Sequence, residues 1–111
     1  MKPPHLAEFE ELVLLAVWGL GDEAYAVPIQ QRIEQRAAHV TSLGSIYRTL
    51  SRLEKKGLVT SWMGAVSNRR GGKRKRFYRV TGTGKTALYR QRLARERMWQ
   101  GLEYEPSLRA G

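Results

Sequence analysis

The residues best suited to bind phosphate lie in the second half of this 111-residue chain. Gly84-Lys85-Thr86 matches the end of a nucleotide-binding loop, in which glycine amides and a lysine surround phosphate groups. Such a loop needs another glycine five residues before Gly84, where this sequence has Arg79. It also needs an acidic residue on a later strand, and no aspartate follows residue 88. We therefore interpret the triplet as the start of a helix after a strand, and we do not expect nucleotide hydrolysis.

Other catalytic and metal-binding patterns are missing from the sequence. The chain has no cysteine, and its only histidines are His5 and His39. No spacing suggests a Ser-His-Asp arrangement or a pair of carboxylates in an apolar setting. We therefore expect no enzymatic activity, no cofactor and no metal site. No segment resembles a signal peptide and the apolar run at 12–20 is too short to cross a bilayer, so we expect a cytoplasmic protein without a membrane partner.

Positive charge is concentrated in one part of the chain. The net charge is +10, and residues 48–97 hold sixteen lysines and arginines against two glutamates. This excess predicts a polyanionic partner. Nucleic acid is the first interpretation, while an anionic membrane surface and a merely solvated basic surface are the alternatives.

Three helices are predicted before residue 57. Apolar side chains recur every three or four residues over 6–20, which indicates a helix with a long apolar stripe. A second helix has Pro28 in its first turn, where the missing N–H costs little. A third is predicted at about 42–56. Its apolar face is expected in the core and consists of Leu43, Ile46, Leu50 and Leu53.

The opposite face of the third helix carries short polar side chains and arginines. A helix of this kind fits the major groove of DNA, where arginine is the commonest reader of guanine. We expect Arg48 or Arg52 to contact a base and Ser45 to lie at the DNA surface, whereas Tyr47 either reaches a phosphate or packs in the core. The predicted DNA-binding residues of this helix are Ser42, Ser45, Tyr47, Arg48 and Arg52.

A β-hairpin with a basic tip, the wing, is predicted at about 58–80. Two strand-like segments flank GAVSNRRGGKRK, in which glycine, asparagine and serine predict a turn. Three helices followed by such a hairpin form a winged helix-turn-helix domain, predicted over 1–81, whose third helix enters the groove. The predicted phosphate contacts of the wing are Arg69, Arg70, Lys73, Arg74 and Lys75.

A fourth helix is predicted over 82–103, with a disordered tail at 104–111. Its apolar side has no later element in the chain to pack on, so we expect a second copy of the chain to cover it. The predicted fold is therefore mainly α with a small β-hairpin and a C-terminal dimerisation helix. The predicted interface residues are Leu14, Trp18, Leu88, Met98, Trp99 and Leu102.

The sequence resembles the PadR family of bacterial transcriptional regulators, in the subgroup with one short C-terminal helix. The resemblance is carried by LGSIYRTLSRLEKKGLV at 43–59, by Gly71-Gly72 and by KRFYRVTGTG at 75–84. Ala24-Tyr25 stands where the family has Gly-Tyr. The resemblance implies a homodimer, joined through its last helix, that binds palindromic operators and usually represses.

Two further possibilities concern the partners. Some members of the family release DNA when a small, often aromatic, ligand binds near the dimer interface, and Trp18 and Trp99 could line such a pocket, although we interpret them first as interface packing. A basic RNA-binding or ribosome-associated protein is the alternative function. Sequence-specific RNA readers usually carry exposed aromatics on a sheet, whereas the aromatics here alternate with basic residues on a short hairpin. We therefore expect binding to double-stranded DNA.

Overall fold

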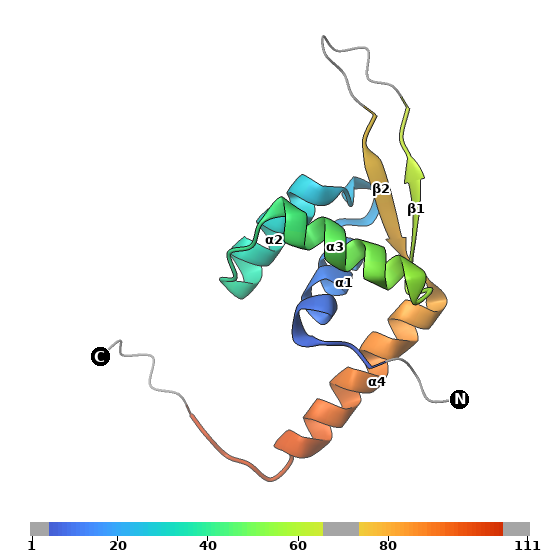
Figure 1. The fold of residues 1–111 in the computed structure, drawn as a ribbon. Helices are drawn as coiled ribbons and strands as arrows, with labels where there is room; N and C mark the ends of the chain where they lie inside the picture. The colour runs from blue at the N-terminus through green and yellow to red at the C-terminus, as the bar shows by residue number, and fades with distance from the viewer. Residues whose placement is uncertain (1–4, 66–73, 106–111) are drawn as a thin grey trace.

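The chain folds into three packed helices, a two-stranded hairpin and a fourth helix that leads away from them (Figure 1). The computed structural model describes residues 5–65 and 74–105. The predictions on Arg69, Arg70 and Lys73, and on the tail from residue 106 onward, therefore lie outside the described residues. The elements are α1 (Glu8–Leu20), a 3-10 turn (Gly21–Glu23), α2 (Ala26–Ala37), α3 (Leu43–Lys55), β1 (Val59–Met63), β2 (Arg76–Val80) and α4 (Gly82–Trp99).

The hydrophobic core lies where α1, α2 and α3 meet, and the hairpin and the start of α4 close it. Burying each aliphatic side chain there stabilises the fold by about 1.5–3 kcal/mol. The largest fully buried side chains include Leu6, Leu14, Ile29, Ile46, Leu50, Leu53 and Leu58.

Helix α3 begins and ends where local signals in the sequence place it. Ser42 is its N-cap, and the Ser42 Oγ accepts a hydrogen bond from the Ser45 amide at 3.1 Å. The helix ends before Gly57, whose φ of +74° lies in the left-handed region. The prediction that Leu43 faces the core is wrong, because Leu43 is the first residue of the helix and is 37% exposed.

The hairpin is antiparallel and is fastened to the helices along β2. Its register pairs Val59 with Val80 and Met63 with Arg76. The Tyr78 amide donates to the Ala24 carbonyl at 2.9 Å, which ties β2 to the turn between α1 and α2. Burial of the Tyr78 ring raises the pKa of its phenol, so the ring remains neutral in the core.

Helix α4 starts at a tight junction with the hairpin. Thr81 caps it, since the Thr81 Oγ1 accepts from the Gly84 amide at 3.0 Å and donates to the Gly57 carbonyl at 2.8 Å. A Cβ at position 84 would collide with the carbonyl oxygen of Leu58. The Gly-Lys-Thr triplet therefore lies in the first two turns of a helix after an antiparallel hairpin, and its glycine is required by packing.

The predicted end of α4 is wrong by four residues. The helix ends at Trp99, not near residue 103, and Gly101 follows with a φ of +82°. The chain therefore turns out of the helical path before Leu102. Within residues 5–65 and 74–105, no helix is long and apolar enough to cross a membrane.

The order and packing of these elements are those of a winged helix domain with one added C-terminal helix. The predicted fold class is thereby confirmed.

Candidate nucleic-acid interface

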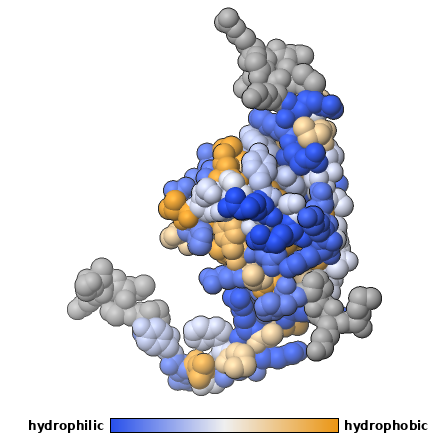
Figure 2. Space-filling model, in the orientation of Figure 1, coloured by the Kyte–Doolittle hydropathy of each residue, from blue (hydrophilic) through white to orange (hydrophobic). Residues whose placement is uncertain are grey.

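The outward face of α3 is polar and basic along its whole length. Arg48, Ser51, Arg52 and Lys55 are exposed, while Ile46, Leu50 and Leu53 on the other side are fully buried. Figure 2 shows this as a hydrophilic region over α3, in the orientation of Figure 1. The helix therefore presents to solvent a row of cations that contributes nothing to the core.

Arg48 lies along the first turn of α3. Its Nη2 donates to the Ser45 Oγ at 3.2 Å, and its Nη1 would be 3.3 Å from a Cβ at Gly44. Ser45, predicted at the DNA surface, and Arg48, a predicted base contact, are thus adjacent toward the N-terminal end of the helix. In helix-turn-helix proteins this end of the recognition helix contacts the base edges.

The Arg52 side chain contacts two residues, Thr49 and Glu10, that the sequence analysis did not identify. Its Nη2 donates to the Thr49 Oγ1 at 3.2 Å, and its Nε lies 4.0 Å from the Oε2 of Glu10 in α1. The Lys56 Nζ, at the end of α3, donates to both Glu10 carboxylate oxygens at 2.8 and 3.1 Å. Glu10 thus joins the C-terminal end of α3 to the start of α1.

The Glu10 carboxylate is charged although its side chain is only 6% exposed. Burial alone would raise its pKa, but hydrogen bonds from Lys56 and from the Ala7 amide, together with the charges of Lys56 and Arg52, outweigh burial and lower the pKa below its usual value. The Ala7 amide donates at 2.9 Å, so the same carboxylate also caps α1. The sequence signal for this role is the position of Glu10 three residues after the N-cap, Ala7.

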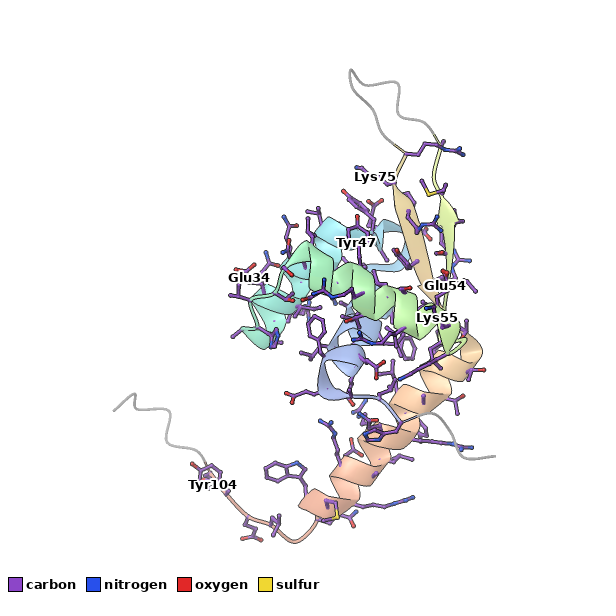
Figure 3. All side chains as sticks on the ribbon, in the orientation of Figure 1. Glu34, Tyr47, Glu54, Lys55, Lys75 and Tyr104 are labelled. Atoms are coloured by element: carbon purple, nitrogen blue, oxygen red, sulfur yellow. The ribbon has the colours of Figure 1, made fainter. Side chains whose placement is uncertain are left out.

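Tyr47 and Ser42 lie at the surface of the same helix. The Tyr47 side chain is 51% exposed, which excludes a pure core role for its ring. Ser42 is exposed but its Oγ caps the helix. In Figure 3, Tyr47 and Lys55 extend from α3, and Lys75 lies at the upper end of the hairpin strands, just before β2.

The described part of the wing is rigidified by alternating aromatic rings and cations. The Phe77 ring packs between Tyr25 and Trp62, with ring centroids 5.5 and 6.1 Å apart. The Lys75 Nζ lies 4.4 Å above the Tyr25 ring, and the Arg79 guanidinium lies 5.3 Å from the Trp62 ring. The predicted site residues Lys75 and Arg74 are both exposed, and the Arg74 Nε donates to the Gly64 carbonyl at 3.0 Å.

A network of side chains joins α3 to the wing. The Ser61 Oγ in β1 donates to the Glu54 carboxylate of α3, and the Arg76 Nη1 in β2 donates to the Ser61 Oγ at 2.9 Å. A groove of about 270 Å³ runs between α3 and β2, and Tyr47, Ser51, Glu54 and Arg76 are among its lining residues. Helix α3 and the wing therefore border one groove, and Arg76 is the basic residue among its lining side chains.

The second half of α4 exposes large apolar side chains. Met98 is 78% exposed, Trp99 65% and Leu102, just beyond the helix, 66%. Trp18 of α1 is half-exposed and faces a groove of about 400 Å³ between α1 and α4, whose lining also includes Leu15, Tyr89 and Trp99.

Two of the predicted interface residues need correction. Leu14 and Leu88 are buried within the chain, because β2 and the first turns of α4 cover the side of α1 that the sequence left open. Leu14 is fully buried and belongs to the core, and Leu88 is 5% exposed at the bottom of the groove between α1 and α4.

Comparison with known proteins identifies the family. The sequence profile of the PadR-like family of transcriptional regulators matches residues 14–90. An uncharacterised protein of Lysinibacillus sphaericus is 37% identical over 71 residues, a match that spans 62% of each chain.

Solved structures show the same fold. A PadR-like transcription factor from Bacteroides fragilis superposes with a TM-score of 0.68 at 23% identity, covering 81% of this chain and 82% of that one. A PadR family regulator from Clostridium difficile gives 0.65 at 24% identity over 86% and 99%. Bacillus subtilis PadR, solved with operator DNA, gives 0.65 at 15% identity; the match covers 95% of this chain but 54% of that one.

The resemblance seen in the sequence is therefore confirmed by the profile match over residues 14–90, and the winged helix that carries it is confirmed by the structural neighbours. The chain belongs to the PadR-like family of transcriptional regulators.

Proposed function

We propose that this protein is a homodimeric regulator that binds a palindromic operator in double-stranded DNA, and that it represses. The observation that carries the proposal is that α3 exposes a face of arginines and a lysine, and that α3 and the hairpin line one groove. Arg48 and Arg52 lie on the exposed face of α3, and Arg76 lies across the groove from it. A recognition helix flanked by a basic wing contacts base edges and backbone phosphates together.

The roles of the α3 residues follow from their positions. We assign Arg48 to a base, with Ser45 beside it at the DNA surface. Arg52 is anchored by Thr49 and Glu10, so its guanidinium is pre-positioned for either a base or a phosphate. Tyr47 has an exposed side chain and is assigned to a phosphate. Ser42 contributes mainly by capping the helix, which places the first α3 amides at the DNA surface.

Double-stranded DNA is favoured over RNA by the packing of the aromatic residues. Single-stranded RNA readers stack unpaired bases on free aromatic faces. Here Tyr25, Phe77 and Trp62 pack on one another and on Lys75 and Arg79. The rings are used to stiffen the wing, so the observations favour groove recognition by α3.

A dimer is proposed because of the exposed apolar end of α4. Met98, Trp99 and Leu102 are exposed, and Trp99 shares the groove between α1 and α4 with Trp18. A second copy would cover these side chains. We assign Trp18 and Trp99 to interface packing, and no effector ligand is part of the proposal. Repression follows the usual behaviour of the family, since a dimer bound over a promoter excludes polymerase.

The deciding experiment is selection of bound DNA from a random duplex pool by the purified protein. The proposal expects an inverted repeat whose half-site centres are about one helical turn apart. A parallel selection from a random RNA pool tests the alternative. Recovery of a single unpaired half-site would contradict the dimer, and enrichment from the RNA pool alone would contradict DNA recognition.

A further inference from the structure

Helix α4 is attached to the rest of the protein at two separate places. Its first two turns are held by apolar packing, since Gly84, Ala87 and Leu88 are its buried residues. Beyond Leu88 no α4 residue is buried. The second attachment, two turns from the helix start, is polar and involves a single residue on α1.

This second attachment centres on Glu11. The Gln91 Nε2 of α4 donates to the Glu11 Oε2, and the Arg95 Nη1 lies 3.4 Å from the Glu11 Oε1. The Gln91 Oε1 also accepts from the Leu6 amide at 3.3 Å. Gln91 therefore bonds to α1 and to the segment before it at once. We call Glu11, Gln91 and Arg95 the α4 latch.

The latch connects two different helices, and its carboxylate is partly shielded from water. The Glu11 side chain is 15% exposed and the Arg95 side chain 56%, so water screens the Arg95 ion pair on one side only. Arg92, one residue from Gln91, provides a contrast: its Nε bonds to Glu96 at 2.9 Å, which is also on α4. Arg92 thus leaves the angle of the helix unconstrained, whereas the latch constrains it.

We propose that the α4 latch fixes the angle between α4 and the α1–α3 unit, and that this angle sets the spacing of the two half-sites that the dimer accepts. The inference rests on the proposed function, in which α4 joins the two subunits. The 18-residue helix is about 27 Å long, so a tilt of about 5° at its base moves its far end by about 2 Å. A two-fold dimer doubles that displacement, which then exceeds the rise of about 3.4 Å per base pair.

Glu10 and Glu11 are neighbours in the first turn of α1 and serve the two helices separately. Glu10 bonds to Lys56 at the end of α3, and Glu11 bonds to Gln91 and Arg95 of α4. The first turn of α1 thus contacts both the predicted recognition helix α3 and the predicted dimerisation helix α4. Gln91 and Glu11 act as positioning residues, because neither lies on the exposed face of α3.

The test measures binding of the full chain to duplexes that carry the selected half-sites at spacings changed one base pair at a time. The wild type is expected to bind one spacing at least tenfold better than spacings two base pairs away. Gln91→Ala should reduce that ratio at least threefold or move the optimum. Glu11→Gln should give an intermediate profile, because its amide oxygen still accepts from Gln91 while the charge facing Arg95 is lost. Arg92→Ala is the matched control and should keep the wild-type profile.

Two further measurements separate the possible failures. Sequence preference within one half-site and the mass of the dimer should be the same for Gln91→Ala and wild type. An unchanged spacing profile in a dimeric Gln91→Ala variant would overturn the inference alone, as would an equal loss of affinity at every spacing. A wild-type protein that sediments as a monomer on DNA would overturn the proposed function and the inference with it.

Discussion

Helices α3 and α4 present opposite chemistry to solvent. Ile46, Leu50 and Leu53 of α3 are fully buried within the chain, and its exposed face is mostly polar, with Arg48, Arg52 and Lys55 as its cations. The second half of α4 is not covered, and it exposes Met98 and Trp99 among its arginines. Both helices are well formed, so the contrast concerns their partners and not their stability as helices.

The contrast indicates that one domain needs two different partners. A covered helix with a cationic outer face gains most from a polyanion, since its cations exchange bound counterions for phosphates. A helix with exposed large apolar side chains gains most from another apolar surface, because burial removes those side chains from water. Changes confined to α4 should therefore alter assembly, and changes confined to α3 or the wing should alter DNA binding.

The largest effect is expected for Trp99→Ser. Burying such a side chain is worth about 1.5–3 kcal/mol and a two-fold interface contains it twice, so the dimer dissociation constant should rise by about 10²–10⁴. Sedimentation equilibrium measures that constant. Trp62→Ser is the control: it removes another exposed tryptophan ring, from the wing, and should leave the dimer dissociation constant unchanged. Equal dissociation constants for Trp99→Ser and wild type would place the interface elsewhere.

Arginine substitutions on α3 should have the next largest effect. Arg48→Ala is expected to cost about 1–3 kcal/mol of operator binding and to relax specificity at one position, because a bidentate contact to guanine is lost. Arg52→Ala is expected to fall in the same range if its anchored guanidinium reads a base. Binding to a panel of single-base operator variants measures both, with Arg36→Ala at the end of α2 as the control. A loss that is equal for all sequences would show backbone contacts only.

The wing should control the salt dependence of binding. Each phosphate contact contributes about −0.9 to the log–log slope of affinity against salt, so Lys73→Ala with Arg74→Ala should flatten the slope by up to about two units. Sequence preference should change little. The charge-conserving pair Lys73→Arg with Arg74→Lys is the control and should retain the wild-type slope. A slope that the alanine pair leaves unaltered would assign the phosphate contacts to other residues.

The smallest effect is on stability and depends on pH. The pKa of Glu10 is lowered from the ordinary value of 4.5, so its stabilising contribution is present above that value and is lost as pH falls through the folded pKa. Glu10→Gln should cost about 1–2 kcal/mol near neutral pH, discounted because Lys56 is partly exposed. Urea unfolding should show this difference shrinking as the pH falls below 4.5.

Glu34→Gln, at an exposed position on α2, is the control for Glu10→Gln and should cause no pH-dependent difference. If the stability difference between wild type and Glu10→Gln stays constant with pH, the stabilisation does not depend on the negative charge of the Glu10 carboxylate.

The parts of the fold that were predictable from the sequence are those with local signals. A capping hydroxyl at Thr41 or Ser42, a stop at Gly57 and the apolar repeat between them predict α3, and the structure places the cap at Ser42. The family resemblance over 43–59 and 75–84 supports the wing. These signals act within a few residues of one another, so they do not depend on the tertiary structure.

The contacts that position the helices were not predictable, because their partners are far apart in the chain. Glu10 and Lys56 are 46 residues apart, and Glu11 and Gln91 are 80 apart. In the sequence, the two glutamates look like ordinary acidic residues at a helix start. Leu14 was assigned to an interface because periodicity cannot show that β2 and α4 return to cover that side of α1.

The close approach of Gly84 to the Leu58 carbonyl also bears on how such chains can diverge. Every single-residue replacement of a glycine adds a Cβ, and here that atom would meet backbone, which cannot swing aside as a flexible side chain does. Descendants of this sequence are therefore expected to keep Gly84 while their operators and surface charges drift. A Gly-Lys-Thr triplet at the same position in distant sequences would indicate that they inherited this packing contact from a common ancestor. In genome searches for nucleotide-binding proteins, the triplet would be a false positive.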